Sequence, residues 1–121
     1  MDTENKSSRK ILGLLGLLGG NNRICFVEGD ILRMINYIKI KHPDVFPESG
    51  GDVELILEDT LQSMKIQGLI TTDPNDHEYS LNASKKEFIL SILEEEEVGE
   101  LIPIVHGLSA ENYGYKVVSV P

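Results

Sequence analysis

A chain of 121 residues, 40% of them hydrophobic, is long enough for one domain with its own core. Its lone cysteine, Cys25, excludes an internal disulfide framework and favours a reducing, cytoplasmic setting. The net charge of −9 is uneven: residues 1–51 sum to +1 and residues 52–121 sum to −10, so the second half opposes a polyanionic partner.

The chain begins with a polar segment, residues 1–8, for which we predict a flexible N-terminus. Residues 9–18 then predict a short helix that ends at a glycine pair. This helix is too short to span a membrane, which takes about 20 apolar residues, so we expect no membrane association. Gly13 and Gly16 disfavour a helix on propensity alone, and we predict that they allow close packing against another backbone.

A strand and a second helix follow. Residues 24–27 form a short apolar run typical of a strand. Residues 30–41 predict an amphipathic helix with Asp30 as its N-cap and His42 as an exposed residue at its C-terminal end. Proline and glycine then mark a loop over residues 44–51.

The middle of the chain predicts a helix, a strand, a turn and a second strand. An apolar stripe predicts a helix over residues 52–67, with Asp52 at its start and Gly68 as its C-cap. A strand is expected to begin at Leu69-Ile70, and the Asp, Asn and Pro that follow are typical of a turn. Residues 79–81 alternate like a half-buried return strand.

The last third contains a helix and two extended segments. Residues 84–87 match a capping box and predict the start of a helix that continues to Leu93. We interpret the acidic run at residues 94–97 as the C-terminal end of this helix, either solvated or open to a basic partner. Residues 101–105 and 115–120 look extended, and could pair as a hairpin, join a sheet edge or dimerise by strand addition.

The residues that define the middle region are Leu61, Met64, Gly68-Leu69-Ile70, Tyr79-Ser80-Leu81 and the capped helix from Ser84. This arrangement resembles the recognition helix, wing and following helix of the winged-helix (winged helix-turn-helix) superfamily. The resemblance implies an α+β fold with three to four helices, a small antiparallel β-sheet with a wing and a C-terminal extended segment. It places the winged-helix-like domain at residues 9–98 and a C-terminal extension at residues 99–121.

Winged-helix domains mostly bind nucleic acid or other proteins. A helix and wing that read DNA need Lys or Arg to neutralise phosphates. The corresponding helix and turn here carry seven acidic residues, which repel a polyanion. We therefore expect a protein-interaction module, a subunit or regulator in an assembly, whose partner is a basic protein, and we consider a homodimer. The candidate partner-binding residues are Glu54, Glu58, Asp59, Asp73, Asp76 and Glu78.

The alternative is a transcriptional regulator that binds nucleic acid through the first half of the chain, where most of the basic residues lie. This function requires those residues to form one continuous positive patch. An acidic mimic of DNA is a third interpretation. The candidate nucleic-acid-binding residues are Arg9, Lys10, Arg23, Arg33, Lys39 and Lys41.

No motif in the sequence is typical of a catalytic site. His42, His77 and His106 fit no Cys/His spacing of a metal site, and Cys25 in an apolar run is more typical of a small buried residue than of a nucleophile. We therefore expect neither enzymatic activity nor a cofactor or metal site.

Overall fold

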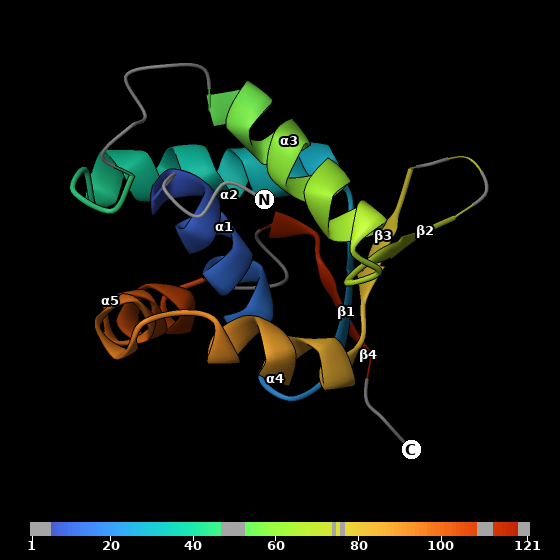
Figure 1. Cartoon of the computed structure of the whole chain (residues 1–121). Helices are drawn as coiled ribbons and strands as arrows, with labels where there is room; N and C mark the ends of the chain where they lie inside the picture. The colour runs from blue at the N-terminus through green and yellow to red at the C-terminus, as the bar shows by residue number, and fades with distance from the viewer. Residues whose placement is uncertain (1–5, 47–52, 74, 76, 109–112, 119–121) are drawn as a thin grey trace.

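The computed structural model describes residues 6–46, 53–73, 75, 77–108 and 113–118. These residues form five helices and a four-stranded antiparallel sheet (Figure 1). The α+β class is confirmed, with more helices than the three to four predicted. The elements are α1 (Lys6–Leu17), β1 (Arg23–Phe26), α2 (Glu28–Lys41), α3 (Val53–Ile66), β2 (Thr71–Thr72), β3 (Tyr79–Leu81), α4 (Ala83–Ser91), α5 (Glu95–His106) and β4 (Lys116–Val118).

The sheet has the strand order β2-β3-β1-β4, with every neighbouring pair antiparallel. β1 lies inside the sheet, where Ile24 is opposite Leu81 of β3 on one side and Val117 of β4 on the other. The strands predicted in the segments 24–27 and 79–81 are confirmed.

The β2–β3 ribbon begins later than the sequence predicts. Leu69 and Ile70 are buried and precede the first strand residue, Thr71. They do not form the strand because their side chains fill the core at the end of α3. The ribbon itself is the antiparallel turn that the sequence predicts, with Thr71 opposite Ser80.

Helix α1 is the centre of the molecule and packs against α3, α4 and α5 (Figure 1). It begins at Lys6 rather than at residue 9, because Ser8 already belongs to its buried face. There the Oγ atom of Ser8 lies 2.7 Å from Oγ1 of Thr60 in α3. A helix surrounded by other elements needs apolar residues on several faces. The buried apolar residues of α1, together with Leu18 just after it, are Ile11, Leu12, Leu14, Leu15 and Leu18.

The glycines of α1 do allow close packing, although against side chains rather than against another backbone. A Cβ atom on Gly13 would lie 2.6 Å from Cδ1 of Leu93 and 2.8 Å from Cδ1 of Leu101. On Gly16 it would lie 3.0 Å from Cγ2 of Ile89. The two glycines therefore let α4 and α5 approach the surface of α1.

Helix α2 begins at Glu28, two residues before the predicted N-cap. Val27 takes the N-cap position with extended backbone, and Asp30 lies in the first turn, where a negative charge complements the helix dipole. The C-terminal prediction is confirmed: His42 is the C-cap, and its backbone N–H donates to the carbonyl of Ile38 at 2.7 Å.

Helix α3 ends where the sequence predicts. Gly68 has a positive φ of 75°, and its N–H donates to the carbonyl of Lys65 while the N–H of Leu69 donates to the carbonyl of Met64. This pair of bonds is the Schellman arrangement, which favours glycine at the left-handed position. The predicted cap at Asp52 lies outside the described residues.

The capping box predicted at the start of α4 is not present there. Asn82 is the N-cap of α4, without a side-chain cap bond, and Ser84 lies inside the helix. A capping box exists one helix later, where Glu94 and Glu97 each bond to the other's backbone at the start of α5. The acidic run at residues 94–97 therefore starts a helix instead of ending one, and its charges suit the helix dipole.

Residues 101–105 are helical, not extended. Leu101 and Ile104 lie on the buried face of α5 and pack beside α1, and this burial outweighs the helix-breaking tendency of Pro103. The predicted hairpin between this segment and the C-terminal strand is therefore wrong. Instead β4 joins the edge of the sheet beside β1, which is the second arrangement predicted.

The border predicted between residues 98 and 99 falls inside α5. None of the described helices combines the length and the apolar character needed to cross a bilayer.

Candidate functional site

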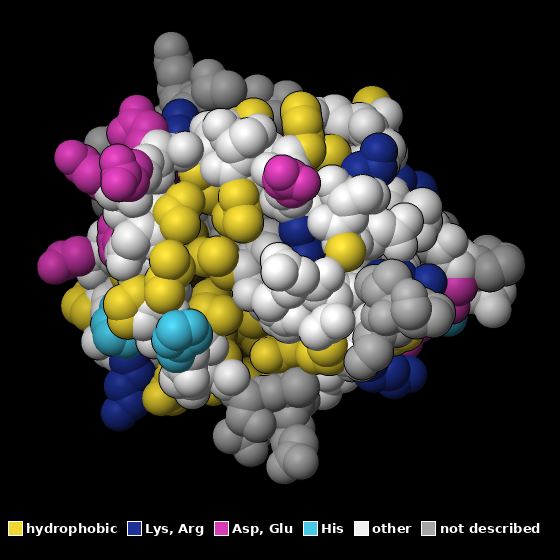
Figure 2. All heavy atoms as spheres, turned by 90° about the horizontal axis from the view of Figure 1, so that it is seen from below, with side chains coloured by type: hydrophobic (Ala, Val, Ile, Leu, Met, Phe, Trp, Pro, Cys, Tyr) yellow, Lys and Arg dark blue, Asp and Glu magenta, His cyan; other side chains and the backbone are white. Residues whose placement is uncertain are grey.

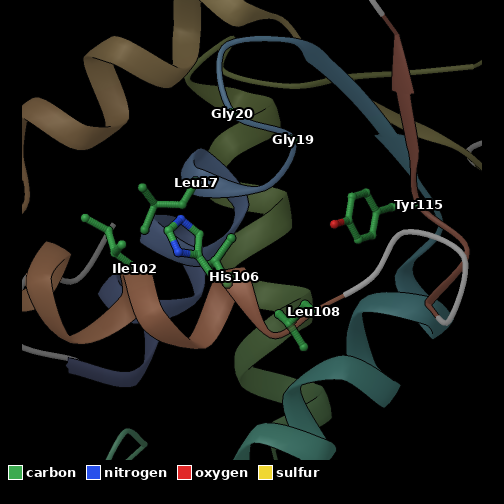
Figure 3. A pocket seen from close by; sticks show the side chains of 8 residues that line it. Leu17, Gly19, Gly20, Ile102, His106, Leu108 and Tyr115 are labelled. Atoms are coloured by element: carbon green, nitrogen blue, oxygen red, sulfur yellow. The ribbon is translucent and has the colours of Figure 1, made fainter.

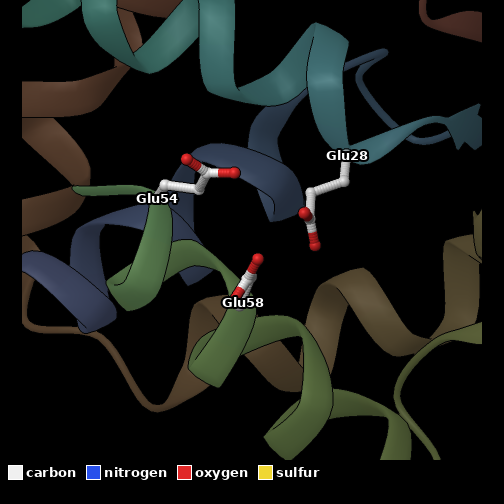
Figure 4. A group of neighbouring side chains, drawn as sticks. All are labelled: Glu28, Glu54 and Glu58. Carbon is white, nitrogen blue, oxygen red and sulfur yellow. The ribbon is translucent and has the colours of Figure 1, made fainter. Parts of the chain in front are cut away.

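An acidic cluster forms where the start of α2 meets the first half of α3. Glu54 and Glu58 lie one turn apart on α3, and Glu28 is the first residue of α2. Carboxylate oxygens of the three residues all lie within 4.8 Å of one another, and Figure 4 shows the three side chains directed toward a common space. We call Glu28, Glu54 and Glu58 the acidic cluster.

Glu28 shows the electrostatic consequence of this arrangement. Partial burial raises the pKa of its carboxyl above the ordinary value, and the negative charges of Glu58 and Glu54 raise it further. The cluster therefore favours a cation. A Lys or Arg side chain of a partner is suitable, and carboxylate oxygens are also the ligands that hard divalent ions prefer.

The predicted acidic site residues divide into two groups. Glu54, Glu58 and Asp59 are exposed on α3, and the first two belong to the acidic cluster. Glu28 was not predicted, because it reaches Glu54 and Glu58 only through the way α2 crosses α3. Asp73 and Glu78 instead hold the β2–β3 turn.

Two bonds of the turn show this structural role. The Oδ1 atom of Asp73 accepts from the backbone N–H of His77 at 2.8 Å. Glu78 forms an ion pair with Lys116 of β4, with Nζ and Oε2 3.2 Å apart. Asp76 lies outside the described residues. Of the predicted acidic residues, two on α3 therefore contribute to the acidic cluster, whereas Asp73 and Glu78 stabilise the structure of the turn.

The predicted basic residues are distributed over three elements. Arg9 and Lys10 belong to α1 and are paired with Glu97 and Glu100 of α5, at 2.5 and 3.1 Å. Arg33 pairs with Asp30 on its own helix. The other candidates are Arg23, exposed in β1, and Lys39 and Lys41 in the last turn of α2.

A buried lysine was missed by sequence reasoning. Lys86 of α4 is 3% exposed, and its Nζ atom donates to the backbone carbonyls of Leu18 and Gly20 at the end of α1. Burial lowers its pKa to about 8. Its place in a run of polar residues gave no sign of this role, which depends on the packing of α4 against α1.

A second feature is a hollow of about 350 Å³ between the end of α1, the C-terminal half of α5 and the segment before β4. Figure 3 shows the His106 ring on one side and Tyr115 on the other, with the tyrosine hydroxyl directed toward the hollow. Burial raises the pKa of that hydroxyl. The lining residues are Leu17, Gly19, Gly20, Ile102, Val105, His106, Leu108 and Tyr115.

Comparison with protein-family models, with curated proteins and with solved structures finds no significant match to this chain. The function is therefore inferred from the surfaces of the molecule alone.

Proposed function

We propose that this chain is a non-catalytic protein-interaction module on a winged-helix-like scaffold. It binds a basic segment of a partner protein through the acidic cluster and α3, and acts as a subunit or regulator in an assembly. The observation that carries the proposal is the convergence of Glu28, Glu54 and Glu58 on one surface.

The order and pairing of the elements support the scaffold. The order α1-β1-α2-α3-β2-β3 is the one expected of a winged helix, and β1 pairs with β3 so that β2 and β3 form a ribbon at one edge (Figure 1). Helix α5 and strand β4 are additions to this arrangement. In this interpretation α3 takes the position of the recognition helix.

The charge on α3 supports a protein partner over nucleic acid. A phosphate backbone near α3 would meet the acidic cluster and the exposed Asp59, and would be repelled. Two of the six basic candidates, Arg9 and Lys10, are already paired with glutamates of α5. A Lys or Arg of a partner protein would in contrast lower the repulsion within the cluster.

Site-specific photo-crosslinking tests the proposal. A photoreactive residue at Gln62, exposed on α3, is expected to crosslink a protein partner in the native cell. Changing Glu54, Glu58 and Asp59 to Lys should abolish this crosslink while the far-ultraviolet circular dichroism spectrum stays native. The control changes Asp44 and Glu87 to Lys, which makes the same kind of charge reversal at exposed positions outside α3.

Two results would contradict the proposal. One is a crosslink that survives the triple change on α3. The other is binding of duplex DNA at low salt within the usual non-specific range of about 10⁻⁴–10⁻⁶ M, with the duplex crosslinked to position 62.

A further inference from the structure

Helices α4 and α5 expose large hydrophobic side chains on the face opposite to α3. Phe88 of α4 and Ile92, the C-cap of that helix, are 51% and 41% exposed, and Ile102 of α5 is 39% exposed. Figure 2 shows hydrophobic side chains gathered in a band on this face. We call the surface formed by Phe88, Ile92 and Ile102 the apolar face.

The apolar face continues into the hollow at the end of α1. Ile102 belongs to both, and Leu17 and Val105 line the hollow beside it. Gly19 and Gly20 form part of its wall at the end of α1. A hollow of about 350 Å³ accommodates one or two bulky apolar side chains inserted from outside.

An acidic border lies beside the apolar face. Glu94, Glu95 and Glu96 are exposed at the start of α5, and Figure 2 shows acidic side chains grouped next to the hydrophobic band. In the described part of the chain, the ion pairs of α5 involve Glu97 and Glu100 and none of these three residues. Glu94 accepts a backbone N–H in the capping box, whereas the negative charges of Glu95 and Glu96 face solvent along the edge of the apolar face.

We propose that the apolar face and its acidic border form a second docking surface, for a short segment of a partner protein that carries bulky apolar residues next to Lys or Arg. The apolar residues enter the hollow and cover Phe88 and Ile102. The basic residues lie against Glu95 and Glu96. This surface is separate from the acidic cluster, because α3 lies above α1 and the helices α4 and α5 lie below it (Figure 1).

Charge complementarity favours this occupant over two others. An anionic lipid surface would be repelled by the acidic border. A second copy of this chain brings a net charge of −9 against an equal charge, and a stable dimer buries about 1,200–2,000 Å², far more than a few side chains supply.

Selection from a displayed library of random peptides of about 16 residues, with the full chain as target, tests the proposal. We expect enriched peptides that combine bulky apolar residues with an excess of Lys and Arg. Their affinity, measured by fluorescence anisotropy, should fall at least about tenfold for the double variant Phe88→Glu, Ile102→Glu. The matched control, the double variant Ile40→Glu, Ile66→Glu, introduces the same two charges at residues that are 79% and 76% exposed and should leave affinity unchanged.

The charged border is tested separately. Glu95→Gln with Glu96→Gln should weaken binding by about three- to tenfold at low salt, and this difference should vanish near 1 M salt, where the Debye length falls to about 3 Å. The control pair Asp44→Asn and Glu87→Gln removes equal charge at exposed positions outside both docking surfaces and should have no effect here.

Backbone amide chemical shifts of the unaltered chain, measured by NMR with and without peptide, keep the test independent of any variant that fails to fold. Peptide-induced shifts should fall on α4, α5 and the residues around Gly20. The proposal is overturned if no peptide is enriched, if enriched peptides lack basic residues, or if the shifts fall on α3. It is also overturned if sedimentation shows a dimer that Ile102→Glu dissociates, since a second copy then covers this face.

Discussion

Arg9 and Glu97 form an ion pair in which Nη2 and Oε1 lie 2.5 Å apart, across the contact between α1 and α5. The same Oε1 atom accepts the backbone N–H of Glu94 at 2.9 Å. One glutamate thus completes the capping box of α5 and fixes that helix to α1. It also neutralises a side chain that, from the sequence, is a candidate for contacting nucleic acid.

A double-mutant cycle with Arg9→Met and Glu97→Gln measures this coupling. We expect a coupling energy of about 1.5 kcal/mol from urea unfolding, since both side chains are partly buried and the bond joins two charged groups. Glutamine can still accept the backbone N–H, so the cap is retained. A coupling energy near zero would show that solvent screens the pair and that it does not help to hold α5 against α1.

The sequence predicts the first half of the fold well. Apolar periodicity and glycine positions identify α1, α2 and α3, because each has one clear apolar pattern and a recognisable end such as Gly68. The prediction for the last third of the chain is wrong for a physical reason. Residues 101–105 contain Pro103 and β-branched residues, which locally favour an extended strand, whereas the burial of Leu101 and Ile104 beside α1 makes them helical.

The candidate site is only partly visible in the sequence. Glu54 and Glu58 lie one turn apart on a predicted helix, so their proximity follows from helical spacing. Glu28 joins them from another element, and this depends on how α2 crosses α3. Sequence spacing carries no information on such a crossing, and the same holds for the hollow between α1 and α5.

Lys86→Met should destabilise the protein by about 1–3 kcal/mol at pH 7. The variant keeps the length of the buried chain but leaves the carbonyls of Leu18 and Gly20 without their donor. Lys85→Met is the matched control, because Lys85 is the exposed neighbour on α4, and its change should stay within about 0.5 kcal/mol. Urea unfolding of the unaltered protein and of both variants measures these differences. Equal stability of the two variants would contradict a capping role for Lys86.

The same lysine predicts a dependence on pH. Its folded-state pKa of about 8 lies below the ordinary value of 10.5, so between these values the unfolded chain binds more protons than the folded one. Stability of the unaltered protein relative to Lys86→Met should therefore rise with pH between about 8 and 10.5. Thermal unfolding of both proteins across this range measures the difference, and a flat difference would show that Lys86 titrates normally.

Glu28→Gln should raise the melting temperature at pH 7. The pKa of Glu28 is raised in the folded state, so its ionised form costs stability above that pKa, and the cost disappears as the carboxyl is protonated. The advantage of the variant should shrink as pH falls toward 4.5, the ordinary value for this carboxyl. Glu87→Gln on α4 serves as the control for loss of one exposed charge. An advantage that is constant with pH would mean that repulsion in the acidic cluster is not its cause.

The close approach of α5 to α1 can be tested at one glycine. Gly13→Ala places a methyl group 2.6 Å from Cδ1 of Leu93 and 2.8 Å from Cδ1 of Leu101, and Leu101 is fully buried and cannot withdraw into solvent. Such overpacking costs about 1–3 kcal/mol, whereas alanine gains about 1 kcal/mol in helix propensity, so we expect a net loss of stability.

Gly99→Ala in α5 is the matched control, because a Cβ there meets no atom within 4 Å and only the propensity gain remains. The two variants should therefore shift the midpoint of urea unfolding in opposite directions. If both variants raise the midpoint, α1 and α5 are not packed so closely that Gly13 is required, and the hollow between them is not held in a fixed shape.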